Sequence, residues 1–378
     1  MTSSAIIQNI PCTLVTGFLG AGKTTIINQL LATKPADVRW ALLINEFGRI
    51  GIDGALLKGR QNDVEKPNTI AIREVSGGCI CCTSQLPLQI ALTRLLSEHR
   101  PQRLIIEPTG LAHPHELVKQ LSAPHWQTSL SMQSVITVLS GLQWQQEKYR
   151  SHEGFQAHVQ AADVVIINRY EQLDATCQQD LLTWIGTLNA QASIIWAAPN
   201  DASSELTVAQ LSMQLNQPSA SISKQRATQS SQSRISLTLP NHLLTNMPNA
   251  GNSAAMTMDD EPPYRYHDEQ QGMLLAGWRL PSHWMFAADE LQQWLLQLPN
   301  WQRIKGVVHT SDGWQQLNFT PDSLTITTTS AQIDSRIEVI LLANTDNSHI
   351  NSKVSKNERQ PLIDWDVYDH ELMALLAK

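Results

Sequence analysis

Residues 1–200 alternate short apolar runs with longer amphipathic stretches. The apolar runs are rich in Leu or β-branched residues and predict strands at 12–16, 40–44, 104–106, 135–139, 164–167 and 193–196. The amphipathic stretches predict helices, among them 24–32, 86–97 and 178–188. Strands that alternate with helices favour a mostly parallel sheet covered on both faces. We therefore expect an α/β domain over residues 1–200.

The pattern changes after residue 200. Residues 201–263 are rich in Ser, Gln, Asn, Thr and Met and are interpreted as a polar linker or insertion, although 235–239 alternates like a strand. Regular patterning then returns, with predicted strands at 273–280, 304–309, 314–319 and 336–342 and a helix at 286–298. A last helix is predicted to run to residue 376, with Asp364 as its N-cap. Residues 264–378 are thus expected to form a smaller α+β domain.

Composition narrows the class of protein. The net charge of −7 argues against a general nucleic-acid binder, which usually presents a basic face. No apolar run approaches the roughly 20 residues that cross a bilayer. The N-terminus lacks the basic start and apolar core of a signal peptide. We expect a cytoplasmic protein with neither nucleic acid nor membrane as its partner.

A phosphate-binding motif stands between a predicted strand and a predicted helix. Residues 17–24 read GFLGAGKT and match G-x-x-x-x-G-K-[ST] at every position. Glycines let backbone N–H groups converge on phosphates, and the helix N-terminus favours anions. Lys23 is expected to reach the β- and γ-phosphates, and Thr24 to ligate Mg²⁺. The predicted nucleotide contacts here are Gly17, Gly20, Ala21, Gly22, Lys23, Thr24 and Thr25.

Two further segments complete the predicted nucleotide site. The strand at 104–106 runs into Glu107, whose carboxylate is placed to hold Mg²⁺, and Gly110 can offer its N–H to the γ-phosphate. A helix-capping role for Glu107 is the competing interpretation.

The base is expected to meet Asn168, Arg169 and Glu171, at the place where GTPases usually carry Asn-Lys-x-Asp. A carboxylate there accepts hydrogen bonds from guanine N–H groups that adenine lacks. GTP and GDP are therefore favoured over ATP, and the longer Glu171 weakens that preference.

A cluster of thiols is the second chemical feature. Cys79, Cys81 and Cys82 fall within four residues, a spacing that indicates metal or redox chemistry in a reducing compartment. Three thiolates leave one position of a tetrahedral Zn²⁺ site open for water, a partner's side chain or Glu46. Redox thiols and an iron–sulfur ligand set are the alternatives, and Co²⁺ or Ni²⁺ could replace Zn²⁺. The isolated Cys12 and Cys177 are interpreted as core residues.

These motifs together resemble the CobW-type metal-binding P-loop GTPases. The matching segments are GFLGAGKTT, INEFG, GGCICC and IEPTGLAHP, and the last is most similar to the YeiR-like zinc-binding branch. The resemblance covers residues 13–200 and, more weakly, 273–342 and the final helix. It implies a metal chaperone or insertase in which metal binding is linked to GTP hydrolysis. It also implies Cys79, Cys81 and Cys82 as metal ligands and 45–52 as a switch segment.

Three positions depart from the family pattern. Glu171 replaces the usual Asp, Arg49 stands where an acid is common, and His242 is the one histidine of residues 201–263, where many relatives are His-rich. The last departure argues against metal storage by that segment.

The favoured hypothesis is a GTP-dependent metallochaperone that passes metal to a client metalloprotein. Lys23, Thr24, Glu46 and Glu107 form its predicted catalytic set, with Glu46 positioning the attacking water. The first alternative is a nucleotide-binding metal or thiol sensor that docks on a partner with little turnover, and the second is a small-molecule kinase. Nucleotide-dependent homodimers are common in this class, and the sequence leaves the oligomeric state and the client open.

Overall fold

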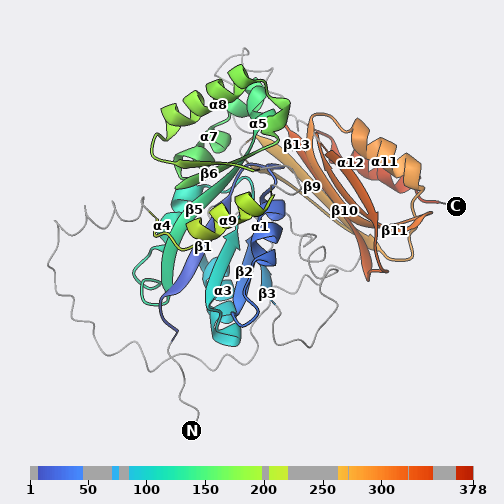
Figure 1. Ribbon diagram of the computed structural model, residues 1–378. Helices are drawn as coiled ribbons and strands as arrows, with labels where there is room; N and C mark the ends of the chain where they lie inside the picture. The colour runs from blue at the N-terminus through green and yellow to red at the C-terminus, as the bar shows by residue number, and fades with distance from the viewer. Residues whose placement is uncertain are drawn as a thin grey trace, which may run out of the picture.

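The computed structural model describes residues 7–45, 70–75, 85–197, 204–219, 263–270, 272–321, 323–343 and 363–377. These residues build two sheets that lie side by side, each with its own helices (Figure 1). The α/β prediction for the first part and the α+β prediction for the second part are both confirmed.

The first sheet has seven parallel strands in the order β3-β2-β4-β1-β5-β6-β7. Its strands are β1 (Ile10–Thr16), β2 (Trp40–Asn45), β3 (Ala71–Val75), β4 (Arg103–Glu107), β5 (Leu130–Ser140), β6 (Val164–Asn168) and β7 (Ser193–Trp196). All six strands predicted in this region are present. The edge strand β3 was not predicted, because a run of five residues that includes Arg73 and Glu74 carries little apolar pattern.

Helices cover both faces of this sheet. They are α1 (Lys23–Ala32), α3 (Gln85–His99), α4 (Pro114–Leu121), α5 (Gly141–Gln145), α6 (Glu147–Arg150), α7 (Glu153–Gln160), α8 (Ala175–Leu188) and α9 (Ser204–Gln214), with a 3-10 turn η1 (Tyr170–Gln172). Helices α1 and α9 pack on one face, and α3, α4, α7 and α8 pack on the other.

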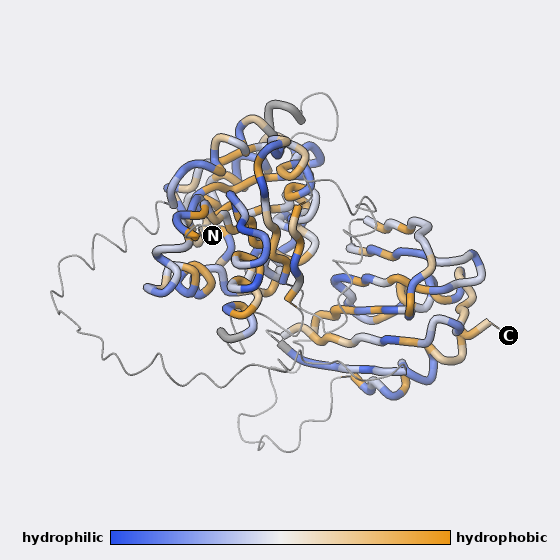
Figure 2. The backbone as a smooth tube through the Cα atoms, turned by 90° about the horizontal axis from the view of Figure 1, so that it is seen from below, coloured by the Kyte–Doolittle hydropathy of each residue, from blue (hydrophilic) through white to orange (hydrophobic). Residues whose placement is uncertain are grey.

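Burial on both faces explains the continuous apolar runs of the strands. In β1, Cys12 and Leu14 point to the α3–α4 face, whereas Val15 points to α1. Both sets are fully buried, so apolar residues occur on both faces of the strand instead of alternating with exposed polar ones. Figure 2 shows these inner strands as mostly hydrophobic and the second sheet as more mixed.

Part of the predicted linker is ordered structure. Helix α9 lies within residues 201–263, and Leu211 and Leu215 pack in the core beside α1. Gln133 of β5 forms an isolated bridge with Pro218 after the helix. The strand candidate at 235–239 lies outside the described residues, and the domain boundaries at 200 and 264 stay predictions.

The second sheet is antiparallel, in the order β12-β11-β10-β13-β9-β8. Its elements are β8 (Tyr264–Gln270), β9 (Met273–Pro281), α11 (Ala288–Gln297), β10 (Trp301–Thr310), β11 (Gly313–Thr320), β12 (Ser323–Thr328), β13 (Asp334–Leu342) and α12 (Trp365–Ala374). Asp364 caps α12 as predicted, because its carboxylate accepts a hydrogen bond from the Asp366 N–H. The two edge strands, β8 and β12, were not predicted, since both are largely polar.

The second sheet is covered unequally. Helices α11 and α12 pack on one face around Trp278, Phe286 and Phe319. Met273, Leu275 and Ile340 of the opposite face join the core of the first domain, beside Phe18 and Leu19. The helices therefore stand on the side away from the first domain, and the other face of the sheet meets it (Figure 1). Among the described helices, none is long and apolar enough to cross a membrane.

Candidate functional site

The phosphate loop runs from the end of β1 to the start of α1. Gly17, Gly20 and Gly22 have φ values of +143°, +71° and +97°, conformations that L side chains rarely adopt. A Cβ on Gly17 would stand 2.4 Å from the carbonyl oxygen of Val138, and one on Gly22 would stand 2.6 Å from Nδ2 of Asn168. The glycines of the motif are thus required by backbone conformation and by close neighbours.

Lys23 folds back onto the loop that precedes it. Its buried Nζ donates to the carbonyl oxygens of Gly17 at 2.9 Å and Phe18 at 3.1 Å. Burial lowers the pKa of Lys23 to about 7, against the attraction of Glu107, and the positive charges of Arg303 and Lys305 lower it further. A bound polyphosphate would supply the negative charge that keeps this ammonium protonated.

Thr24 and Glu107 form the candidate magnesium site. The Thr24 hydroxyl donates to Oε1 of Glu107 at 3.0 Å, and Glu107 is buried at the end of β4. Burial raises the pKa of Glu107, whereas Lys23 and the Thr24 hydrogen bond lower it. A hydroxyl and a carboxylate are oxygen donors of the kind that Mg²⁺ prefers, so this pair fits the ion.

The loops after β4 and β6 both press against the phosphate loop. A Cβ on Gly110 would stand 2.6 Å from the Leu19 backbone nitrogen, so this glycine permits close approach. The Asn168 amide donates to the Ala21 carbonyl at 2.7 Å, while its buried Oδ1 has no hydrogen-bond partner among the described residues. Asn168 therefore braces the phosphate loop and keeps an acceptor that a bound base can satisfy.

One cavity of about 230 Å³ gathers most of the predicted contacts. From the first domain it is lined by Gly20, Gly22, Lys23, Thr24, Thr25, Glu107 and Arg169. Gly17, Ala21 and Gly110 do not line the cavity, so their contacts with a nucleotide stay predictions. Glu171 is exposed in η1 and does not line the cavity, so its role toward the base stays a prediction.

The thiol cluster of Cys79, Cys81 and Cys82 lies outside the described residues, as does the predicted switch segment from Glu46 onward. In the part of the chain that the structure describes, no group of three or more His, Cys, Asp or Glu side chains could hold a metal ion. Cys12 is a core residue as predicted, because it is fully buried and burial raises its pKa to about 12. Cys177 is only half-buried and packs against the core from α8.

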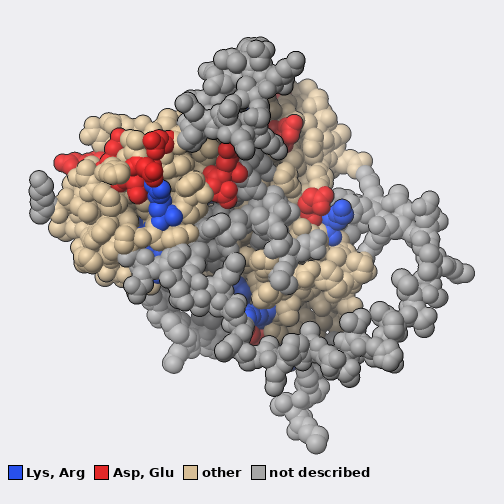
Figure 3. Space-filling model, turned by 180° about the vertical axis from the view of Figure 1, so that it is seen from behind, with Lys and Arg blue, Asp and Glu red and all other residues tan. Residues whose placement is uncertain are grey.

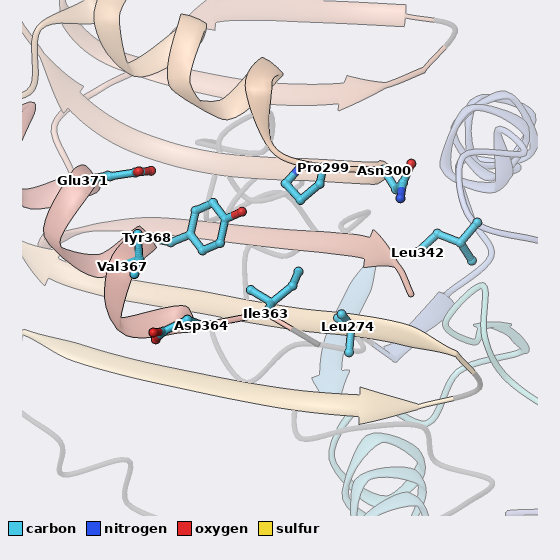
Figure 4. A pocket seen from close by; sticks show the side chains of 9 residues that line it. All are labelled: Leu274, Pro299, Asn300, Leu342, Ile363, Asp364, Val367, Tyr368 and Glu371. Carbon is cyan, nitrogen blue, oxygen red and sulfur yellow. The ribbon is translucent and has the colours of Figure 1, made fainter. Parts of the chain in front are cut away.

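A larger cavity lies elsewhere. About 330 Å³ in volume, it opens between the ends of β9 and β13 and helix α12 (Figure 4). Its carboxylates already serve the fold, because Asp364 caps α12 and Glu371 accepts a hydrogen bond from Trp294 Nε1. Among the described residues, no cation lines this cavity to meet a phosphate, so the smaller cavity is the better nucleotide site.

Two buried residues support the phosphate loop without having been predicted. His158 of α7 donates through Nε2 to the Gly110 carbonyl at 3.1 Å, so its Nδ1 accepts from the Thr16 hydroxyl. Gln143 donates to the Leu19 carbonyl at 2.7 Å. Both are more than 100 residues from at least one partner, and no local pattern marks them.

Comparison with known proteins agrees with this geometry. Residues 11–196 match the model of the CobW/HypB/UreG nucleotide-binding domain. The zinc chaperone YeiR of Escherichia coli is 30% identical over 91% of this chain and 96% of its own length. The chain belongs to the CobW/HypB/UreG family. A zinc chaperone CobW from Sinorhizobium is 34% identical over 46% of this chain and 55% of its own length.

Among solved structures, the zinc-bound YjiA GTPase of Escherichia coli aligns over 88% of this chain and 94% of its own, with 16% identity and a TM-score of 0.40. In the CobW/HypB/UreG nucleotide-binding domain of this chain, the strand β1, the phosphate loop and helix α1 are contiguous, as the motif predicts.

Charged side chains of both signs lie on one face of the molecule. On the face shown in Figure 3, acidic side chains gather at several places and basic side chains are scattered among them. This fits the net charge of −7.

Proposed function

We propose that this protein is a zinc-binding GTPase that couples GTP binding and hydrolysis to the transfer of zinc to a client metalloprotein. The observation that carries the proposal is the cluster of the buried Lys23 and Glu107 with the half-buried Thr24 at one end of the first sheet. In the same sheet, strand β3 directly precedes the thiol segment in the sequence. Relatives named zinc chaperones support the metal, since YeiR covers nearly the whole chain.

The nucleotide half of the proposal rests on charge. Lys23 and the N-terminus of α1 favour a polyphosphate, and the oxygen pair of Thr24 and Glu107 would hold Mg²⁺. When bound, Mg²⁺ neutralises charge on the β- and γ-phosphate oxygens during hydrolysis. The loop residues themselves would orient the phosphates. The glycines of the loop and Gly110 carry no side chains that would keep the phosphates away from the backbone N–H groups.

The coupling half rests on neighbouring strand ends. Strand β2 ends at Asn45, directly before Glu46, and β3 ends at Val75, four residues before Cys79. The Asn45 amide donates to the Val75 carbonyl at 3.0 Å, so the two strand ends are joined by a buried hydrogen bond. β4, which ends in Glu107, pairs with β2 on its other side. A change at the γ-phosphate can therefore reach the strand that precedes the thiols.

The first experiment measures zinc affinity by competition with a chelator. It compares Mg²⁺ with a non-hydrolysable GTP analogue against Mg²⁺ with GDP. Coupling of about 1–3 kcal/mol predicts a difference of roughly 5- to 150-fold between the two states. Cys81→Ala should abolish tight binding, and Cys177→Ala, a half-buried thiol on α8, is the matched control that should not.

The outcomes separate the hypotheses. Tight zinc binding that ignores the nucleotide contradicts the chaperone cycle and favours the metal sensor. Absence of zinc binding in both states points to redox thiols. Phosphate release from GTP, compared with ATP and with Lys23→Ala, tests turnover and the base preference.

A further inference from the structure

The face of the second sheet opposite α11 and α12 meets the first domain and carries charged side chains there. In β10, Ile304 and Val308 pack with α11 and α12, so Arg303 and Lys305 belong to the opposite face. That face is turned toward the first domain (Figure 1). β10 is also fixed there, because the buried Tyr149 hydroxyl of α6 donates to Oε1 of Gln302 at 2.5 Å.

This face forms a wall of the nucleotide cavity. Arg303, Asn318, Thr320, Ser323 and Thr325 of β10, β11 and β12 line the same 230 Å³ as Lys23 and Glu107. The wall touches the phosphate loop itself: a Cβ on Gly20 would stand 3.3 Å from Cγ2 of Thr320. The cavity is thus a cleft between the two domains.

Arg303 is the cation of this wall. Lys305 is buried, is paired across the strands with Glu338 and does not line the cavity. Arg303 lies opposite Ile340 in the register of β10 with β13 and lines the cavity. Arg303 lines this cavity together with Lys23, Thr24 and Glu107, the residues expected at the γ-phosphate and Mg²⁺, and its positive charge lowers the pKa of both Lys23 and Glu107.

We propose that Arg303 contacts the terminal phosphate of the bound nucleotide, so that the second domain distinguishes triphosphate from diphosphate. The inference rests on the proposed function for the identity of the nucleotide as GTP. A guanidinium presents a rigid fork of donors that matches phosphate oxygens. GDP lacks the phosphate group that this fork would bind. Contact between the domains is therefore stronger with GTP, and hydrolysis weakens it.

The test uses the full-length chain and isothermal titration with Mg²⁺ and either a non-hydrolysable GTP analogue or GDP. Arg303→Ala should weaken binding of the analogue roughly 10- to 100-fold, as expected for a charge-assisted hydrogen bond, and that of GDP less than about 3-fold. Arg303→Lys should recover part of the loss. Arg265→Ala is the control, because Arg265 belongs to the same sheet, pairs with the exposed Asp366 and does not line the cavity.

A second pair of variants covers the case in which Arg303→Ala does not fold. Thr325 and Thr327 lie on one face of β12 and are both exposed, and Thr325 alone of the two lines the cavity. Thr325→Glu should weaken binding of the analogue at least about tenfold more than binding of GDP, because the carboxylate repels the additional phosphate. Thr327→Glu should bind both nucleotides like the wild type.

The results are separable. If the wild type binds the analogue and Arg303→Ala binds it equally well while folded, the inference fails and the proposed function stands. If Arg303→Ala lowers the affinity for GDP and for the analogue equally, the inference also fails, because the contact would then not be with the terminal phosphate. A wild type that binds no guanine nucleotide refutes both.

Discussion

His158 offers a quantitative test of how the phosphate loop is supported. The imidazole is 1% exposed and bonded at both nitrogens, to Thr16 and Gly110. Burial lowers its pKa to about 3, the charges of Lys23 and two neighbouring histidines act in the same direction, and the hydrogen bond to Gly110 opposes them. The folded protein therefore keeps His158 neutral.

The sign and size of the effect follow from linkage. Between pH 6.5 and about 3 the unfolded chain binds a proton at His158 that the folded chain does not, so stability falls as the pH is lowered through this window. Between pH 7.5 and 5.5 the ordinary histidine of the unfolded chain becomes mostly protonated, and the loss in unfolding free energy is about 1.4 kcal/mol.

Urea unfolding of the wild type and His158→Gln at pH 7.5 and 5.5 measures this quantity. The variant should be less stable at pH 7.5 by about 2 kcal/mol, because buried groups lose hydrogen-bond partners. Its further loss of stability on acidification should be smaller than that of the wild type by about 1.4 kcal/mol, since glutamine does not titrate. Other titrating groups cancel in the comparison.

His115→Gln is the matched control, because His115 is an exposed residue of α4. It should keep the pH dependence of the wild type. If His158→Gln loses as much stability on acidification as the wild type, His158 is protonated in the folded state and the reasoning is refuted.

Three further substitutions test other contacts of the site. Gly110→Ala places a Cβ 2.6 Å from the phosphate-loop backbone and should weaken binding of the GTP analogue at least about tenfold, whereas Gly186→Ala, with nothing within 4 Å, should bind normally in the same titration. Glu107→Gln removes the carboxylate charge, so a Mg²⁺ titration should show affinity lower by at least about tenfold, and unchanged affinity would contradict the magnesium assignment. Tyr149→Phe deletes the buried donor to Gln302 and should cost about 1–3 kcal/mol in urea unfolding; a stability equal to that of the wild type would show that this bond does not hold the domains together.

Much of the fold is encoded by local periodicity. The six predicted strands of the first sheet and the helix after the phosphate loop were identifiable because each carries its own apolar pattern. The strands that were not predicted lie at the edges of their sheets: β3, β8 and β12. An edge strand buries less of its surface, so polar residues are tolerated and the pattern that would reveal the strand is weak. Helix α9 was not predicted because its apolar residues lie within the polar segment 201–263.

The site divides in the same way. The sequence by itself determined the phosphate loop, because its glycines, Lys23 and Thr24 are contiguous and their spacing expresses the chemistry directly. It also determined that β4 would end in Glu107. The tertiary structure alone decided that His158 would brace Gly110 and that Arg303 would face Lys23, since these residues come from α7 and from a separate sheet. Local periodicity does not show which elements pack against each other. Residues that reach the site from another domain can therefore be identified only from the tertiary structure.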